Sequence, residues 1–342
     1  MQIELINWYH KNKRDLPWRN TLEPYKIWVS EIILQQTQIA TGITYYHQFI
    51  QEFPNTQSLS LADEIKILNI WQGLGYYNRA LNMLKTAKII MSQHRGIFPT
   101  NYNVLIKLAG IGPYTAAAIS SICANEKQAV VDGNVFRVLS RFYNIKTAIN
   151  TTEGKKKITS IANSLISDNE PGIYNQAIMD FGSTHCKKSN PKCSSCPIKK
   201  NCQSLKLKLV SKRPVKKKLL KTKTRYLNYL FISDTKHFLI EQRHDNDIWR
   251  KLYQLPIIEH TKFLNKTDIK NHPYLQSHEI KNIKNEYKIT HRLTHQKLEI
   301  FFWKILVPRI RDTQQFKKIY LKDRPQYPFP KPIQLYFNIE HI

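Results

Sequence analysis

The stretch LAGIGPYTAAAI, residues 108–119, decides the fold of the first part of this chain. Two glycines, Gly110 and Gly112, stand beside a proline, and a run of small helix-forming residues follows. Because the preceding NYNVLIKL (101–108) also has helical character, the pattern predicts two helices joined by a glycine-rich hairpin. Such a hairpin points backbone N–H groups outward at a helix N-terminus, where they can bind phosphate without sequence preference. An ordinary hairpin without a ligand is the alternative.

The charge of the chain points to a polyanionic partner. Its 342 residues carry 53 Lys and Arg against 25 Asp and Glu, a formal net charge of +28. Nucleic acid is the first candidate partner, and a general compositional bias toward Lys is the alternative. The N-terminus lacks a signal-peptide core, and no stretch is apolar enough to cross a membrane. We therefore expect an intracellular protein, in which structural disulfides are rare.

Composition changes along the chain and predicts two domains. Residues 1–205 have helical periodicity interrupted by Gly and Pro, whereas residues 206–224 are rich in Lys and Arg and contain no acid. Residues 225–342 contain aromatic and β-branched segments typical of strands. The predicted fold class is thus mainly α, with a helical domain, a basic linker and a smaller α/β domain.

Four of the five cysteines lie close together in sequence. Cys186, Cys193, Cys196 and Cys202 have the spacing C-x6-C-x2-C-x5-C, which lets four thiolates converge on one site. Structural zinc sites usually combine two close cysteine pairs, and here only Cys193 and Cys196 form one. The spacing favours an iron–sulfur cluster and leaves zinc as the alternative. Cys123, in an apolar helical segment, is predicted to be a core residue.

Two carboxylic acids stand in contrasting sequence environments. Glu31 lies in IWVSEIILQQ, where helical neighbours make it border an apolar stripe, and desolvation there would raise its pKa. Asp132 precedes a predicted helix and is expected to be its N-cap, a position that favours the ionised form. One protonated and one charged carboxyl group are what cleavage of a glycosidic bond requires. For Glu31, the alternative is a carboxylate that reaches water. For Asp132, the alternative is a purely structural cap.

Five motifs together resemble a known enzyme family. They are VSEIILQQTQ (29–38), GLGYYNRA (73–80), LAGIGPYTAAAI, VDGNVFRVLSR (131–141) and the cysteine loop. In this order they are similar to the adenine DNA glycosylases, the MutY family, within the helix–hairpin–helix superfamily that includes endonuclease III. The resemblance spans nearly all of residues 1–205. It continues more weakly through IWRKLYQLP (248–256) and HRLTH (291–295).

The resemblance implies a fold and an activity. Residues 1–205 would form a two-lobed glycosylase domain with a [4Fe–4S] cluster in the loop 186–202, and residues 225–342 would form a Nudix-like domain that reads the lesion. The enzyme would remove adenine mispaired with 8-oxoguanine or guanine from double-stranded DNA. We expect a monomer that acts in the cytoplasm on the bacterial nucleoid. No Nudix catalytic box is visible in the second domain, so pyrophosphatase activity is not implied.

The resemblance also implies residue roles. Glu31 would be the general acid, Asp132 would stabilise the sugar cation with Asn134 in support, and Tyr114 would line the same site. The base pocket would contain Arg14, Trp18, Leu34 and Gln176, and lesion recognition would use Leu293, Thr294 and His295. Predicted DNA contacts are Gln36 and Tyr76 in the base stack, Gly110 and Gly112 in the hairpin, and Lys187, Lys188 and Lys192 in the cysteine loop.

Tyr114 decides between two kinds of glycosylase. Bifunctional relatives similar to endonuclease III have a lysine at this position, and its amine attacks the sugar, whereas tyrosine cannot form a Schiff base. We therefore expect an enzyme that removes the base and stops. An endonuclease III-like glycosylase/lyase and a non-catalytic iron–sulfur DNA-binding protein are the alternatives. Leu293–Thr294 replaces the usual Phe-Ser pair of the family, so lesion recognition departs most from the family pattern.

Overall fold

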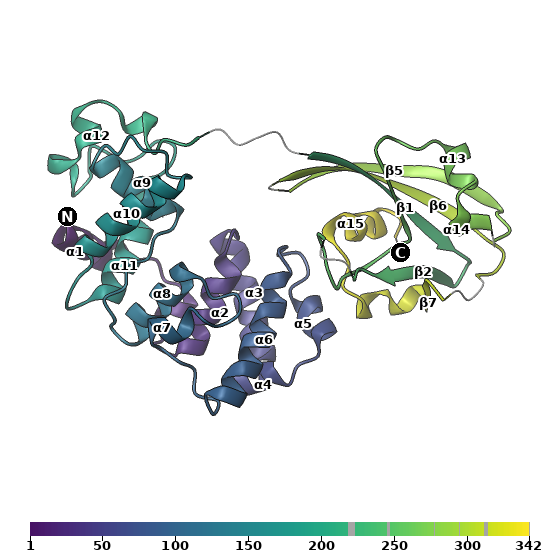
Figure 1. Ribbon diagram of the computed structural model, residues 1–342, viewed down its shortest axis with the longest axis horizontal. Coiled ribbons are helices and arrows are strands. Elements are labelled where there is room, and N and C mark those ends of the chain that lie inside the picture. The colour runs from purple at the N-terminus through teal and green to yellow at the C-terminus, as the bar shows by residue number, and fades with distance from the viewer. Residues whose placement is uncertain (218–222, 245–246, 277, 294, 311–313, 342) are drawn as a thin grey trace. The chain divides into compact units, whose positions relative to one another are not determined.

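The computed structural model describes residues 1–217, 223–244, 247–276, 278–293, 295–310 and 314–341. It divides into two compact units: Met1–Leu61 with Asn82–Leu219, and Ala62–Leu81 with Leu220–Ile342. The first is helical and the second is built mainly on a sheet (Figure 1). In the described part of the chain, no helix is both long and apolar enough to span a bilayer.

The helical unit is built from short helices that often begin at a proline. Pro24, Pro113 and Pro171 stand in the first turn of α2, α8 and α11, where proline loses no hydrogen bond and its φ suits the helix. The helices are α1 (Gln2–Asn12), α2 (Pro24–Leu34), α3 (Ile39–Glu52), α4 (Thr56–Ser60), most of α6 (Asn78–Gln93), α7 (Tyr102–Leu105), α8 (Pro113–Cys123), α9 (Gly133–Phe142), α10 (Thr152–Leu165), α11 (Pro171–Asp180) and α12 (Gln203–Lys206).

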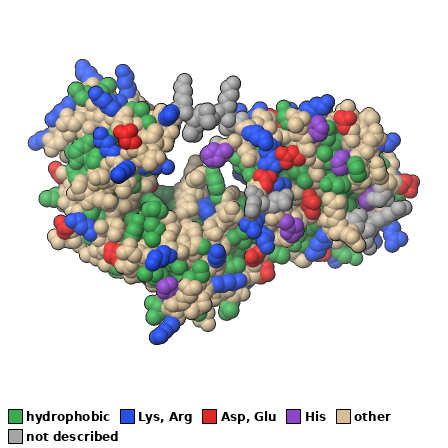
Figure 2. Space-filling model, in the orientation of Figure 1, with side chains coloured by type: hydrophobic (Ala, Val, Ile, Leu, Met, Phe, Trp, Pro, Cys, Tyr) green, Lys and Arg blue, Asp and Glu red, His purple; other side chains and the backbone are tan. Residues whose placement is uncertain are grey.

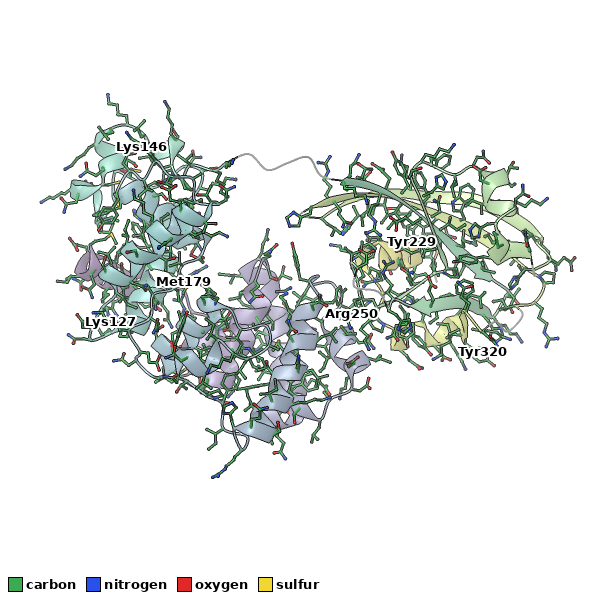
Figure 3. The ribbon with its side chains drawn as sticks, in the orientation of Figure 1. Lys127, Lys146, Met179, Tyr229, Arg250 and Tyr320 are labelled. Carbon is green, nitrogen blue, oxygen red and sulfur yellow. The ribbon has the colours of Figure 1, made fainter. Side chains whose placement is uncertain are left out.

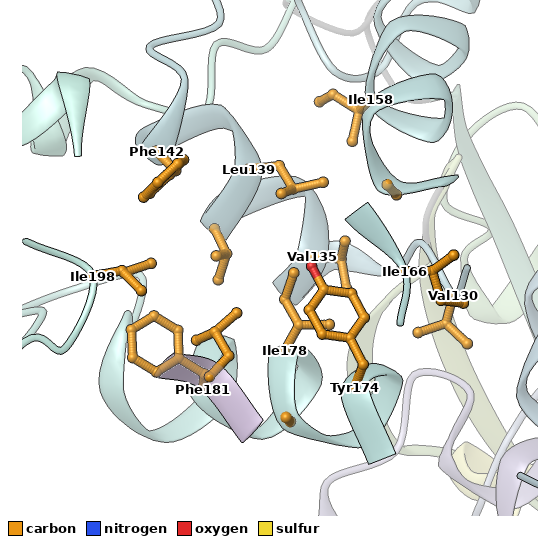
Figure 4. Close-up of a cluster of buried hydrophobic side chains, with 14 of the residues drawn as sticks. Val130, Val135, Leu139, Phe142, Ile158, Ile166, Tyr174, Ile178, Phe181 and Ile198 are labelled. Carbon is orange, nitrogen blue, oxygen red and sulfur yellow. The ribbon is translucent and has the colours of Figure 1, made fainter. Parts of the chain in front are cut away.

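A buried cluster holds α9 against α10 and α11 (Figure 4). The α9 side chains Val135 and Leu139, four residues apart, lie on one face and are almost completely buried. They belong to the same apolar cluster as Ile158 of α10 and Ile178 of α11. Burying each such side chain contributes about 1.5–3 kcal/mol. This packing fixes the start of α9 beside α11, which places the two helices around the site described below.

The predicted helix–hairpin–helix is present as α7, a glycine turn and α8. Gly110 has φ +74°, a left-handed conformation that favours glycine. A Cβ atom at this position would also lie 2.7 Å from the Cβ of Asn82. Gly112 is the N-cap of α8, and a Cβ atom there would meet nothing within 4 Å. The turn therefore needs a glycine at position 110, while the backbone at position 112 is open to an approaching group.

The second unit is a mixed sheet with helices, as its composition predicted (Figure 1). Strand β1 (Lys223–Ser233) pairs in parallel with β6 (Gln296–Leu306) and antiparallel with β2 (His237–Gln242) and β4 (Ile257–His260). The other strands are β3 (Tyr253–Gln254), β5 (Asn282–Arg292) and β7 (Lys317–Tyr320). The helices are α5 (Glu64–Ile70), α13 (Lys266–Lys270), α14 (Pro273–Gln276) and α15 (Lys331–Ile339).

Both faces of this sheet are apolar, because alternate β1 residues enter two different cores. Tyr229 and Phe231 pack with Tyr336 and Phe337 of α15, and Figure 3 shows Tyr229 on the sheet side of that helix. Leu230, on the opposite face, belongs to a core with residues of α13 and α14. A sheet covered on both faces is a rigid support for the loops at its edges.

The basic segment 206–224 is held against the helical unit over its first part. The backbone N–H of Ile149 donates to the carbonyl oxygen of Val215 at 2.9 Å, and Asn150 exchanges two side-chain hydrogen bonds with the backbone of Lys217. Arg141 donates to the carbonyl oxygens of Val210 and Arg213. The segment therefore leaves the helical unit at or beyond Lys217. Residues 218–222 lie outside the described residues.

Candidate active site

A cavity of about 190 Å³ lies in the helical unit and is lined from helices far apart in sequence. Eight of its lining residues are those predicted for catalysis or base binding: Arg14, Trp18, Glu31, Leu34, Tyr114, Asp132, Asn134 and Gln176. The others include Leu16, Arg19, Ser30, Met179 and Ser183. Met179, labelled in Figure 3, is half-buried on α11. The structure thus brings both predicted groups of residues to one site.

Glu31 has the environment that its sequence context predicted. It lies on α2 and is only 8% exposed, between apolar neighbours on the same helix. Burial is the main cause that raises the pKa of Glu31 to about 7; the hydrogen bond to Tyr114 and the charge of Arg19 oppose this shift, and the nearby Asp132 adds a smaller contribution to it. A carboxyl group with this pKa can hold a proton near neutrality and release it to a substrate.

Asp132 caps α9 as predicted, and its cap bonds lower its pKa as expected, but burial has the larger and opposite effect. Its Oδ1 accepts from the backbone N–H of Asn134 at 2.9 Å and of Val135 at 2.8 Å, and Asn134 Nδ2 donates to Oδ2 at 2.6 Å. Burial nevertheless raises the pKa of Asp132, and the cap bonds and Arg137 only partly offset this effect. The sequence pattern identified the cap and gave no sign of the burial. Of the two carboxyl groups, Glu31 shows the larger, near-neutral shift.

Tyr114 lines the same cavity as Glu31. It stands in the first turn of α8 and is hydrogen-bonded to Glu31. Burial raises the pKa of Tyr114 well above its usual range, and the interaction with Glu31 adds to this shift. Its hydroxyl also donates toward Met179 Sδ at 3.3 Å. Tyr114 is therefore a neutral side chain in contact with the acid.

A chain of hydrogen bonds links Asp132 to the cysteine loop. Asn134 accepts from Arg137 Nη2 at 2.8 Å through its Oδ1, while its Nδ2 donates to Asp132. Arg137 Nε donates to the carbonyl oxygen of Cys186 at 2.8 Å. The orientation of the Asp132 carboxylate therefore depends on the backbone of the loop that carries the cysteines.

Three polar residues near the cavity were missed by sequence reasoning: Tyr9, Arg19 and Asp180. Asp180 is completely buried at the end of α11 and accepts hydrogen bonds from both Arg14 and Arg19. Burial alone would raise the pKa of Asp180, but these two arginines lower it. Tyr9 accepts from Arg19 Nη1 at 2.7 Å and donates to Gln176 Oε1 at 2.6 Å. Apart from the Arg19–Tyr9 bond, these contacts span more than 160 residues, so no local pattern could have revealed the network.

The four clustered cysteines lie near one another beside α9. Burial, followed by the charges of neighbouring cysteines, raises the pKa of the Cys193 thiol, and similar effects raise that of Cys196 to about 11. Arg141 Nη1 lies 3.4 Å from the Cys186 sulfur. Among the described side chains, no three His, Cys, Asp or Glu residues are arranged to hold a metal ion. Cys123 is separate from this group, half-buried on α8, and burial raises its pKa to about 12.

The predicted DNA contacts lie at exposed positions. Gln36 and Tyr76 are exposed and have positive φ angles of 58° and 48°, and the Arg79 guanidinium lies 5.8 Å from the Tyr76 ring centre. Lys187, Lys188 and Lys192 are exposed in the cysteine loop. Figure 2 shows Lys and Arg side chains gathered over the part of the helical unit that contains α12.

Of the predicted lesion-reading residues, Leu293 and His295 lie between β5 and β6. The Leu293 N–H donates to the carbonyl oxygen of Gln296, and the Leu293 side chain packs against the core shared with α15. His295 is exposed, and Thr294 lies outside the described residues. On β5, the His291 ring lies 5.9 Å from that of Trp249.

Comparison with known families gives two matches in separate parts of the chain. Residues 29–166 match the HhH-GPD superfamily of base excision DNA repair proteins, and residues 228–338 match the NUDIX domain.

Comparison with individual proteins gives similarity over almost the whole chain. The chain is 41% identical over 302 residues to the adenine DNA glycosylase of Buchnera aphidicola subsp. Baizongia pistaciae, covering 86% of this chain and 83% of that one. It is 39% identical over 209 residues to human adenine DNA glycosylase, covering 58% of this chain and 38% of the human protein.

Solved structures resemble the helical unit. A thermostable thymine-DNA glycosylase superimposes with a TM-score of 0.56 at 26% identity, covering 60% of this chain and 95% of that structure. Endonuclease III in a non-covalent complex with DNA gives a TM-score of 0.53 at 20% identity, covering 61% of this chain and 94% of that structure. The second likeness concerns the fold alone.

Proposed function

The chain belongs to the adenine DNA glycosylase (MutY) family, and from this premise we propose that it excises adenine paired with 8-oxoguanine or guanine in DNA. It is an enzyme of base excision repair, and its substrate is DNA. The observation that best supports the proposal is the cavity in which Glu31, with a pKa near 7, lies close enough to Asp132 for their charges to interact.

Glu31 and Asp132 divide the chemistry of bond cleavage. The protonated Glu31 carboxyl donates its proton to a ring nitrogen of the flipped adenine, and the electrons of the breaking C1′–N9 bond pass to the base. Positive charge then develops on the sugar, and the Asp132 carboxylate stabilises it. Asn134 holds that carboxylate through the 2.6 Å bond from its Nδ2 to Asp132 Oδ2.

Tyr114 favours hydrolysis over strand cleavage. A tyrosine hydroxyl cannot form the Schiff base through which a lyase cuts the strand, so water is the final nucleophile at C1′. The raised pKa of Tyr114 keeps its hydroxyl neutral beside Glu31. The product is free adenine and an abasic site in an intact strand.

Gln36 and Tyr76 are proposed to enter the base stack when adenine is flipped out. Both side chains are exposed on left-handed backbone, a strained conformation that persists only where the surroundings impose it. Lys187, Lys188 and Lys192, with the open backbone at Gly110 and Gly112, provide contacts to phosphate.

We assign the reading of 8-oxoguanine to the second unit, around Leu293, Thr294 and His295. Adenine is a normal base, so the error signal must come from the base opposite. The β5–β6 turn stands on a rigid sheet and carries an exposed imidazole that can donate or accept hydrogen bonds.

Ending the chain after Lys217 should separate excision from lesion reading. The shortened enzyme keeps Glu31, Asp132 and the whole cavity, so it should still cut G·A duplexes. Its preference for 8-oxoguanine·A over G·A should fall by roughly 5- to 150-fold, the effect of losing a base-specific contact. Single-turnover excision from the two duplexes measures this preference. Full discrimination by the shortened enzyme would place lesion reading in the helical unit.

We propose that Cys186, Cys193, Cys196 and Cys202 hold a [4Fe–4S] cluster. The charges of Cys186 and Cys202 raise the pKa of both Cys193 and Cys196, so the four thiols lie close enough to form a donor set. Zinc would need all four sulfurs at about 2.3 Å from one point, whereas each cysteine of a four-iron cluster binds its own iron, so the sulfurs lie farther apart. The sequence spacing of the four cysteines, with only one close pair, favours the iron–sulfur cluster over zinc. When bound, the cluster fixes the loop that presents Lys187, Lys188 and Lys192.

Protein purified without oxygen should contain iron and sulfide in about equal amounts and be brown. Serine replacement of Cys193 should lower both contents and weaken binding to undamaged duplex, because the lysines of the loop lose their fixed arrangement. Cys123→Ser is the matched control and should change neither the iron and sulfide contents nor the binding to undamaged duplex. Stoichiometric zinc without iron or sulfide would contradict the proposal.

A further inference from the structure

A buried chain of hydrogen bonds runs from Asp180 to the wall of the cavity. Arg19 forms a two-pronged pair with the completely buried Asp180, with both Nη–Oδ distances at 2.8 Å. The same guanidinium donates to the Tyr9 hydroxyl at 2.7 Å, and this hydroxyl lies 2.6 Å from Gln176 Oε1. Tyr9 is 3% exposed, on a helix at the opposite end of the domain sequence.

The chemistry of these groups fixes the direction of every bond in the chain. A guanidinium only donates, so the Tyr9 oxygen must accept from Arg19. The hydroxyl has one proton, and burial raises the Tyr9 pKa, so this proton is retained. If the Gln176 amino group faced Tyr9, the hydroxyl proton would be buried without an acceptor. The acceptor facing Tyr9 must therefore be the amide oxygen.

The amide nitrogen of Gln176 then faces away from Tyr9. Gln176 lines the cavity, and within the described residues its Nε2 has no hydrogen-bond partner. A neutral adenine offers ring nitrogens that accept hydrogen bonds and an exocyclic amino group that donates. An amide N–H in the cavity suits a ring nitrogen, whereas an amide oxygen would suit the amino group.

We propose that Tyr9 is a positioning residue of the base pocket: with Arg19, it holds the Gln176 amide so that its N–H₂ group donates to an acceptor atom of the bound base. This inference rests on the proposed function, because it assumes that the flipped base enters this cavity. In this arrangement Gln176 hydrogen-bonds to a ring nitrogen of adenine and makes no hydrogen bond to the exocyclic amino group.

A double-mutant cycle tests the inference with the full-length enzyme. Single-turnover excision is measured for wild type, Tyr9→Phe, Gln176→Ala and the double variant. The substrates carry adenine or unsubstituted purine, which lacks the amino group, opposite the same base. Tyr174→Phe is the control, since it removes a hydroxyl from the same helix as Gln176, and this hydroxyl has no partner among the described residues. Thermal unfolding checks that each variant is folded.

Tyr9→Phe should slow excision of adenine by roughly 5- to 30-fold, as expected when a buried hydrogen-bonding group loses its fixed orientation. In the Gln176→Ala background, Tyr9→Phe should change the rate by less than about twofold, because Tyr9 acts through Gln176. Gln176→Ala should slow excision of adenine and of purine by the same factor. Tyr174→Phe should behave as wild type.

Three results would overturn the inference. Tyr9→Phe could leave the rate unchanged, or it could slow the Gln176→Ala enzyme as much as the wild type, which would make its role purely structural. The effect of Gln176→Ala could also disappear on purine, which would mean that the amide oxygen reads the amino group. Failure of the wild-type enzyme to excise adenine would instead contradict the proposed function, so the two failures are distinguishable.

Discussion

Replacement of Glu31 by glutamine is expected to lower single-turnover excision of adenine by about 10²–10⁴-fold, the usual contribution of a general acid. Adenine is a poor leaving group unless it is protonated, so the loss should lie at the upper end of this range. Glutamine keeps the size of the side chain and can still hydrogen-bond to Tyr114, but it has no acidic proton. Affinity for the mispaired duplex should be largely retained, and this is measured under conditions where no excision occurs.

The pH dependence provides a second readout for Glu31. The proton-bearing form is the active one, and the pKa of Glu31 is about 7. Excision by the wild type should therefore fall as pH rises above about 7, approaching a tenfold loss per pH unit. The residual activity of Glu31→Gln should lack this decline.

Glu23→Gln is the matched control for Glu31. Glu23 is an exposed residue at the start of the same helix, and its surface pair with Lys26 contributes little to stability. This variant should excise adenine at the wild-type rate. Near-normal excision by Glu31→Gln would rule out Glu31 as the acid.

Replacement of Asp132 by asparagine is expected to be comparably severe, with excision reduced by about 10²–10³-fold, the effect of losing a major electrostatic contact in the transition state. The side-chain oxygen of asparagine can still accept from the backbone N–H groups of Asn134 and Val135, so α9 should remain capped. The variant loses the negative charge opposite the developing sugar cation, together with the oxygen that accepts from Asn134 Nδ2. Single-turnover rates at saturating enzyme isolate this step.

Asp63→Asn is the matched control for Asp132. Asp63 is the N-cap of α5, where its side chain accepts from the backbone N–H of Ile65, and it does not line the cavity. The same substitution at this cap should leave excision unchanged. If Asp132→Asn kept nearly the full rate, stabilisation of the cation would have to come from another group.

The sequence predicted those parts of the site that depend on local pattern. The glycine hairpin, the cap at Asp132 and the apolar surroundings of Glu31 are properties of a few consecutive residues, and the structure confirms them. The grouping of Glu31 with Tyr114 and Gln176 could not follow from periodicity. It was expected only from the resemblance, and the cavity confirms the grouping.

The features that were missed depend on tertiary packing. Asp180 looked like any helix-terminal carboxylate in the sequence, yet it is completely buried between two arginines that lie 161 and 166 residues away along the chain. The burial that raises the pKa of Asp132 is likewise a result of tertiary packing. Desolvation is a property of the assembled core, and no short stretch of sequence encodes it.

The measurement that tests the account most directly compares two duplexes, one with a single 8-oxoguanine·A pair and one with a single thymine glycol. Each is incubated with the full-length enzyme, and strand breaks are counted before and after treatment with alkali. We predict release of free adenine from the first duplex, breaks in it only after alkali, and no reaction with the second. Breaks without alkali, or cleavage at thymine glycol, would indicate a lyase similar to endonuclease III. Binding without release of adenine would contradict the assignment of Glu31 and Asp132 as catalytic residues.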